Sequence, residues 1–431
     1  MKQLISFFII GSLLMISCRP KASDKSPEAG EINTDRFVVI GGAEMGGFMD
    51  DALYDEGQEA SLGNLLALQF QKIGLGEFIQ PLVSSTVGCN KSDKSKLFLG
   101  YKTDCLGVSS LSPIRYASTG DLSVFSQPFT NAHHNFGIPE LKVTSLWTPG
   151  YASENPYFMR MSANPSTDKV AAAYLDRNPT FFAMMLGMDD VLEFAKKGAS
   201  VGDMTSIQDF SSQLVPLIDS LMSKGSKGVI STVPDVTDLP FFTTIPYNGL
   251  KLTAEKAASL NQIYNPIGIT FQVGDNPFMI EDPSIGGFGV RKMMPGECVL
   301  LSVPLDSVKC NQMGSVFPLR DEFVLTLDEV EQIQARINAY NDLIAQQALT
   351  NKLASVDAYN FYKKLKGGLM YNGIKMSLTF VSGGTVSLDG IHLTPRGNAL
   401  LANEFIKSIN SNYKSTIPLL NATAYRGNRF P

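Results

Sequence analysis

An aspartate and a histidine near the C-terminal end of the chain have the residue types and spacing that acid–base chemistry requires. Asp389 and His392 lie three residues apart within the segment 387–397. A histidine exchanges protons near neutral pH, and a carboxylate bonded to its far ring nitrogen fixes the tautomer and stabilises the imidazolium form. The spacing fits a structural turn histidine equally well, so the surrounding elements must decide between the two interpretations.

The other two histidines of the chain are the adjacent pair His133 and His134. Neighbouring side chains on a strand point to opposite faces, which makes this pair a poor metal site. Two interpretations stay open: the pair borders the same cleft as His392, or both are loop residues of an insertion. Since the cysteines form no CxxC motif and no histidine set accompanies them, we predict neither a metal nor another cofactor.

Short apolar runs alternate with helical patterns along the chain, which predicts a parallel sheet covered by helices. The predicted strands are 37–40, 181–186, 228–233 and 298–303, and 353–359 is a short apolar segment. The predicted helices are 62–73, 207–222, 327–349 and 395–409, with Thr394 as the N-cap of the last and Pro395 in its first turn. Asp389 and His392 then lie on the loop before the last helix.

Composition indicates a globular protein of one large or two medium domains, since 44% of its 431 residues are hydrophobic. The formal net charge is -5. No run of Lys and Arg is long enough to form a phosphate-binding stripe, so nucleic acid is not an expected partner.

The N-terminal residues have the pattern of an export signal. Lys2 precedes an apolar run, 5–16, that is too short to span a bilayer, and Ser17 and Cys18 follow it. Residues 1–18 resemble a bacterial lipoprotein signal peptide, in which the cysteine becomes the lipidated N-terminus; the alternative is an ordinary secretory peptide with an incidental Cys18. The polar residues 19–35 are expected to form a flexible tether before a folded domain at 36–431.

Two regions, about 82–164 and 240–320, do not follow the strand and helix alternation. Both are rich in turn residues, and we interpret them as insertions that cap one end of the sheet. Each holds two of the four remaining cysteines, which would suit long excursions without a core of their own. Of the three pairings that these cysteines allow, the simplest is two local disulfides, Cys89 with Cys105 and Cys298 with Cys310.

The segment Gly41 to Asp50 has the small residues that a nucleophile turn needs after a strand. Taken with the Asp-Gly-Ile-His motif at 389–392, the chain resembles the SGNH/GDSL hydrolases, in particular their lipoprotein members from Bacteroidota. The similarity extends in the same order to 52–59, 135–139, 187–192, 233–237 and 239–242. It implies a three-layer α/β/α fold with a mostly parallel sheet, and an esterase or lipase site in an envelope lipoprotein, anchored in the outer membrane.

The resemblance assigns the family's site positions one by one. The conserved block near the C-terminus matches Asp389 and His392, and the glycine that helps to form the oxyanion hole matches Gly137. Two positions differ from the family pattern: the nucleophilic serine matches Ala43, and the oxyanion-hole asparagine matches Asp189. Ser61 cannot replace the serine, because the same register puts it in the first helix.

These two differences point to a degenerate site. Alanine has no hydroxyl for His392 to deprotonate, and loss of a triad serine typically costs around 10⁶-fold in turnover. An ionised Asp189 would repel the oxyanion, whereas a hydrogen-bond donor at this position typically raises turnover by roughly 10² to 10³-fold. Only a protonated Asp189 would donate such a hydrogen bond.

Three functions therefore stay open. The first is a degenerate esterase-family lipoprotein that keeps its cleft for an acyl or ester ligand or for a partner. The second is an active ester hydrolase on lipids or acylated glycans that uses His392 and water. Glu44, which follows Ala43, is either a further group of that site or a solvent-facing turn residue. The third is a structural partner of an outer-membrane protein, whose contacts the long insertions would supply.

Overall fold

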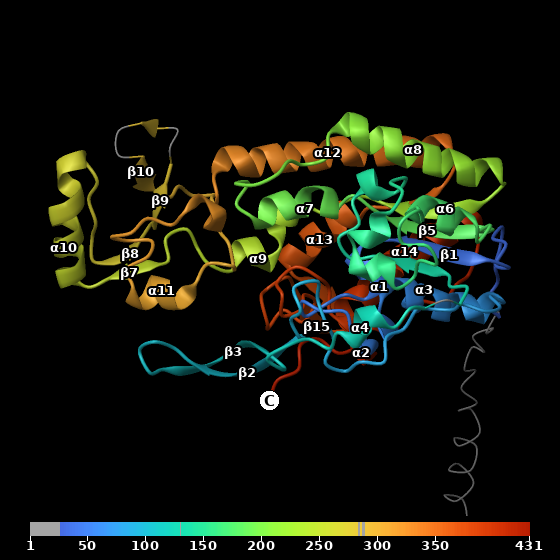
Figure 1. The fold of residues 1–431 in the computed structure, drawn as a ribbon, viewed down its shortest axis with the longest axis horizontal. Helices are drawn as coiled ribbons and strands as arrows, with labels where there is room; N and C mark the ends of the chain where they lie inside the picture. The colour runs from blue at the N-terminus through green and yellow to red at the C-terminus, as the bar shows by residue number, and fades with distance from the viewer. Residues whose placement is uncertain (1–25, 130, 283–284, 287–288) are drawn as a thin grey trace, which may run out of the picture.

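The computed structural model describes residues 26–129, 131–282, 285–286 and 289–431, and a five-stranded parallel sheet lies at its centre (Figure 1). In sheet order the strands are β13 (Ala354–Val356), β6 (Lys227–Ser231), β5 (Phe181–Met185), β1 (Phe37–Gly41) and β4 (Asn135–Gly137). The winding direction therefore reverses between β1 and β5. Open α/β sheets bind ligands beside such a reversal, at the carboxyl ends of the strands.

The two strands beside the reversal are apolar throughout. Every residue of β1 and of β5 is buried, as expected of parallel strands that are covered on both faces. Gly41 pairs with Met185 on one side and with Gly137 on the other. This register puts the loops that follow β1, β5 and β4 at the same level, where their residues can form one site.

Helices cover both faces of the sheet (Figure 1). On one face α3 (Leu62–Phe70) packs against α14 (Pro395–Tyr413); on the other, α8 (Ile207–Ser223) packs against α6 (Val170–Leu175) and α12 (Leu327–Thr350). The buried residues of α12 recur every three or four positions, from Ile333 to Ala348. The predicted three-layer α/β/α fold with a parallel sheet is confirmed.

The remaining short elements surround these layers. They are α1 (Ala43–Gly46), α2 (Asp55–Glu59), α4 (Ser123–Ser126), α5 (Pro156–Met159), α7 (Asp189–Lys196), α9 (Pro240–Thr243), α13 (Ala358–Gly367), β14 (Leu369–Tyr371) and β15 (Ile374–Met376). No helix in the described residues has the length and hydropathy needed to cross a membrane. The predicted signal peptide, with Cys18, and tether residues 19–25 lie outside the described residues.

The predicted strand at 298–303 is wrong. Only β11 (Cys298–Val299) is extended, and it pairs antiparallel with β12 (Val324–Leu325), away from the central sheet. The chain then turns, since the N–H of Val303 donates to the carbonyl of Leu300. A short apolar run can be a buried loop as readily as a strand. The fifth central strand is instead β13, from the apolar segment 353–359.

The range predicted for the first insertion, 82–164, is too long, because it contains β4 of the central sheet. Its protruding part is a hairpin of β2 (Leu97–Thr103) and β3 (Ser109–Arg115), which extends away from the sheet below the second insertion (Figure 1). Tyr101 and Leu106 on this hairpin are 73% and 67% exposed.

The second insertion forms a lobe beyond α9 (Figure 1). Its elements are β7 (Leu250–Leu252), α10 (Ala254–Tyr264), β8 (Gly274–Asn276), β9 (Met279–Glu281), β10 (Val290–Lys292) and α11 (Leu305–Cys310). Two hydrophobic clusters are buried here, one around Phe278 and Ile280 and one around Leu260 and Tyr264. The expectation that this excursion lacks a core of its own is therefore wrong.

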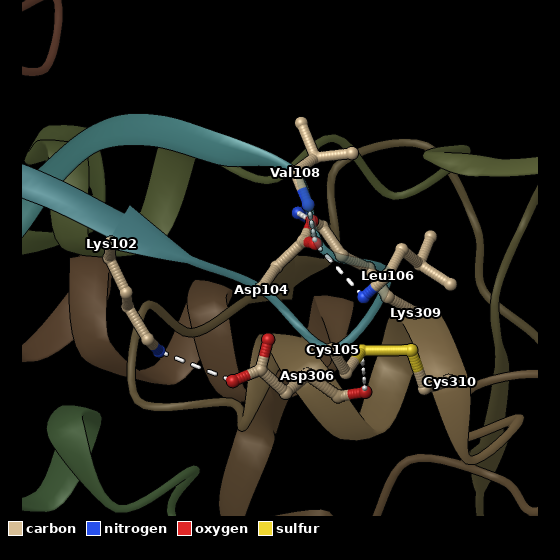
Figure 2. Close-up of a disulfide and its surroundings, with 8 residues drawn as sticks. All are labelled: Lys102, Asp104, Cys105, Leu106, Val108, Asp306, Lys309 and Cys310. Carbon is tan, nitrogen blue, oxygen red and sulfur yellow. Dashed lines mark hydrogen bonds and ion pairs between the residues drawn. A yellow bond between two sulfur atoms is a disulfide. The ribbon is translucent and has the colours of Figure 1, made fainter.

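The two local disulfides predicted from the sequence are also wrong. Cys105 at the tip of the hairpin is bonded to Cys310 at the end of α11, with Cα atoms 6.5 Å apart, whereas Cys89 and Cys298 are buried free thiols. Lys309 pairs with Asp104 at 2.9 Å beside the bond (Figure 2). The local pairing does not form because the hairpin carries Cys105 away from Cys89 and across to the second insertion.

Candidate functional site

The loop before α14 holds Asp389 and His392 in hydrogen-bond contact. Asp389 Oδ2 lies 2.9 Å from His392 Nδ1, and Asp389 Oδ1 accepts the backbone N–H groups of Ile391 and His392 at 2.8 and 2.9 Å. The predicted cap of α14 is present, since Thr394 accepts the N–H of Gly397. The short loop thus fixes the carboxylate, and the carboxylate fixes the imidazole.

A second pair of acidic residues, which the sequence interpretation missed, holds this loop from the other side. The N–H of Asp51 donates to Asp389 Oδ2 at 3.1 Å, and Asp50 Oδ1 accepts the N–H of Leu388 at 3.0 Å. Asp50 Oδ2 also accepts the Tyr54 hydroxyl at 2.8 Å. Both aspartates have left-handed backbone conformations, with φ of 53° and 57°. Such strain persists where surrounding contacts determine the conformation, which marks 50–51 as positioning residues for the dyad.

Ala43 begins α1 at the turn that follows β1, and it is 3% exposed. The preceding glycine lies close to Asp189, since a Cβ on Gly42 would be 2.6 Å from Asp189 Oδ2. Asp189 is the first residue of α7, after β5. The structure therefore brings the predicted positions 43 and 189 together at the reversal point of the sheet, and the turn carries no hydroxyl at position 43.

Glu44 adds a buried acid to this site. It is 4% exposed, and its Oε1 has no hydrogen-bond partner among the described residues. Burial raises the pKa of Glu44, while His392 lowers it. Burial, with the charge of Glu44 second, also raises the pKa of Asp189 to about 8. Asp189 is therefore mostly protonated at neutral pH, which is the condition under which its carboxyl group can donate a hydrogen bond.

His392 is held in its charged form. Burial alone would lower its pKa, but the Asp389 carboxylate, and then Glu44, outweigh burial and raise the pKa to about 9. His392 in turn holds the pKa of Asp389 well below its usual range, against the effect of burial. The residue is 7% exposed, and Phe48 packs edge-on against its ring at 5.1 Å. No hydrogen bond to another described residue engages Nε2, the nitrogen that would face a substrate.

Gly137 lies at the end of β4, beside α1. A side chain at this position would overlap the backbone of Gly46, so only glycine allows the close approach. Its N–H donates to Asn135 Oδ1 at 2.7 Å. The N–H that the family resemblance assigns to the oxyanion hole is thus already engaged by a side chain.

The histidine pair belongs to other surroundings. His134 Nδ1 accepts the N–H of Ile79 at 3.0 Å, and His133 packs against the Phe136 ring with centroids 4.5 Å apart. Within the described residues, no hydrogen bond or ring contact joins either histidine to the dyad. The residues that the structure describes contain no group of three His, Cys, Asp or Glu side chains placed to hold a metal ion.

No family model and no curated protein matches this chain. Among solved structures, it is similar to a candidate GDSL-like lipase from Parabacteroides merdae ATCC 43184, with 9% identity and a TM-score of 0.35 over 89% of this chain and 99% of the other. It is similar to a variant of an acetyl-xylooligosaccharide esterase from Geobacillus, with 10% identity and a TM-score of 0.38 over 88% and 96%. It is also similar to the lipase/acylhydrolase from Enterococcus faecalis, with 11% identity and a TM-score of 0.35 over 90% and 100%.

Proposed function

We propose that this protein is an envelope lipoprotein of the SGNH/GDSL esterase and lipase family whose site no longer forms an acyl-enzyme. The observation that carries the proposal is the combination of an intact Asp389–His392 pair, 2.9 Å apart, with alanine at position 43 of the turn after β1. An acyl-enzyme needs a hydroxyl or thiol on that turn. The paired acid and base have no nucleophile to activate.

The electrostatics of the site support the same conclusion. A pKa of about 9 for His392 leaves roughly 1% of the imidazole neutral at pH 7. A general base works best when its pKa lies near the working pH, because the neutral form must be populated. The site therefore presents a hydrogen-bond donor where an active hydrolase would present an acceptor.

The remaining groups suit binding. A protonated His392 and a protonated Asp189 both donate hydrogen bonds, so the ligand that fits them presents carbonyl or carboxylate oxygens, as an acyl or ester group does. Ala43 and His392 are only 3% and 7% exposed, so a bound group would be largely shielded from water. We therefore propose that the site binds an acyl or ester ligand, or a partner, without turnover.

Hydrolysis of short-chain nitrophenyl esters and of acetylated xylooligosaccharides by the purified full chain tests this proposal. We expect the native chain to be no faster than its His392→Ala variant. Ala43→Ser, alone and with Asp189→Asn, reports whether the rest of the site is competent. Native turnover that His392→Ala abolishes would refute the proposal.

One observation favours the alternative, an active hydrolase that uses water. The raised pKa of Asp189 lets its carboxyl group donate to an oxyanion, as the family's asparagine would. Such an enzyme would need neutral His392 and protonated Asp189 together, so its rate would pass through a maximum between about pH 8 and pH 9. A native rate with that profile identifies the alternative, and a flat background rate excludes it.

The location and the partner of this lipoprotein are part of the proposal. We propose that Cys18 carries a lipid that anchors the chain in the outer membrane, and that the exposed hairpin contacts an outer-membrane protein. Tyr101 and Leu106 support a contact surface there, because both are largely exposed. Membrane fractionation of the native chain and Cys18→Ser tests the anchor. If the chain is purified from cross-linked envelopes and no outer-membrane protein accompanies it, the result would argue against the partner.

A further inference from the structure

Several buried polar groups without partners gather in one region, apart from the Asp389–His392 site. Seven buried side-chain atoms of the described residues have no hydrogen-bond partner, and four of them belong to His133, Arg160, Tyr174 and Arg177. Ring contacts connect part of this group: His133 packs on Phe136 at 4.5 Å, and Phe136 packs on Tyr174 at 5.6 Å. Native interiors rarely leave such groups unpaired, so their clustering calls for a ligand.

Arg160 is a buried cation without a carboxylate. It is 3% exposed, its Nη2 donates to the carbonyl of Leu82 at 3.0 Å, and its Nε has no partner. Within the described residues no acidic side chain forms an ion pair with it, and burial lowers its pKa to about 10. A buried charge is costly unless an opposite charge accompanies it, so this guanidinium favours an anion in its vicinity.

His133 supplies the opposite kind of group, a buried acceptor. Its Nδ1 lies 3.3 Å from the carbonyl of Asn131, which can only accept, so Nδ1 carries the proton. Nε2 is then a lone pair with no donor. Burial lowers the pKa of His133 to about 4, with the charges of Arg177 and Arg160 acting in the same direction, so the ring is neutral at pH 7.

A cavity of about 530 Å³ reaches two of these residues. His133 and Arg177 line it, together with Lys169. Asp168 lines it as well, but its carboxylate already accepts the Ser162 hydroxyl at 2.7 Å and the N–H of Asn164 at 2.9 Å. Asp176, an exposed acid, also lies in the lining. Arg177 forms no ion pair with either acid, so its charge remains available to a ligand.

We propose that this cavity binds a small oxyanion that carries a hydroxyl group, of which hydrogen phosphate is the simplest. The charged oxygens accept from the guanidinium group of Arg177, the charge of Arg160 acts on the same region through its effect on His133, and the hydroxyl donates to Nε2 of His133. No residue of this cavity belongs to the Asp389–His392 site, so the inference stands whether or not that site is catalytic.

Isothermal titration calorimetry of the full chain at pH 7, with phosphate against sulfate at matched ionic strength, tests the proposal. Sulfate has the same shape but no hydroxyl. We expect saturable phosphate binding and weaker sulfate binding. Arg177→Gln should weaken phosphate binding by about tenfold or more, because it removes a charged hydrogen bond. Lys256→Gln, an exposed change on α10, is the matched control and should leave binding unchanged.

His133→Phe keeps a ring of similar shape but removes the acceptor, so it should abolish the preference for phosphate over sulfate. Circular dichroism establishes whether this variant folds, and Arg177→Gln tests the site independently if it does not. The proposal is overturned if phosphate does not saturate, if sulfate binds as tightly as phosphate, or if Arg177→Gln binds phosphate like the native chain.

Discussion

The charge of His392 at neutral pH can be measured directly, because the chain contains only three histidines. Their surroundings in the structure separate the pKa values of the three histidines widely. Asp389 and Glu44 raise the pKa of His392 to about 9, burial lowers that of His133 to about 4, and burial also lowers that of His134. At pH 7 we therefore expect one charged and two neutral imidazoles.

The size of the effect on stability follows from the pKa shift of His392. A rise of the pKa from the usual 6.5 to about 9 corresponds to roughly 3 kcal/mol in favour of the imidazolium in the folded state. Because the folded pKa is above the unfolded one, this stabilisation is complete below pH 6.5 and is lost as the pH rises from 6.5 through 9. The stability difference between the native chain and His392→Gln should therefore shrink over that interval, as measured by urea unfolding at pH 6 and 9.5.

Two variants separate the causes of the shift. Asp389→Asn removes the largest opposing charge, so burial should prevail and lower the pKa of His392 below 6.5. Glu44→Gln removes the weaker charge and should lower the pKa by less. Proton–carbon NMR of Cε1-labelled histidine, titrated from pH 3.5 to 10 and assigned with single His→Gln variants, measures each value. A His392 resonance that titrates near pH 6.5 in the native chain would refute the reasoning.

Two further predictions concern the contacts that hold the fold. Joint replacement of Cys105 and Cys310 by serine should destabilise the chain by roughly 2–5 kcal/mol, because the bond closes a loop with a sequence separation of 205; a thermal unfolding midpoint equal to that of the unreduced native chain would contradict this. Gly137→Ala should cost roughly 1–3 kcal/mol in urea unfolding, because the methyl group would overlap Gly46. Gly367→Ala, which meets no atom within 4 Å, is its control, and equal effects of the two changes would count against the argument.

The elements that could be predicted from the sequence have strong local patterns. β1 and β5 are continuous apolar runs, and α8, α12 and α14 combine apolar periodicity with caps. β4 was missed because its three residues, Asn-Phe-Gly, have no strand pattern of their own. They are extended because β1 pairs with them, which is a tertiary cause.

The same division applies to the site. The Asp389–His392 pair could be predicted because both residues and their loop are local in sequence. The support from Asp50 and Asp51 could not, because it depends on contacts across 338 positions. The disulfide prediction was wrong for a related reason. Short separations in the sequence favour local pairing, whereas the path of the hairpin brings Cys105 to Cys310.

Alanine at position 43 and glutamate at position 44 both oppose proton transfer to His392. A serine at 43 could attack only after transfer of its proton to His392, and Glu44 helps to keep that ring protonated already. Ala43→Ser alone therefore supplies a nucleophile without a populated base at pH 7. Activity of this variant would depend on pH values near 9, where His392 is half neutral, or on removal of the Glu44 charge as well. Two adjacent residues of one turn thus oppose acyl transfer by different physical routes, one chemical and one electrostatic.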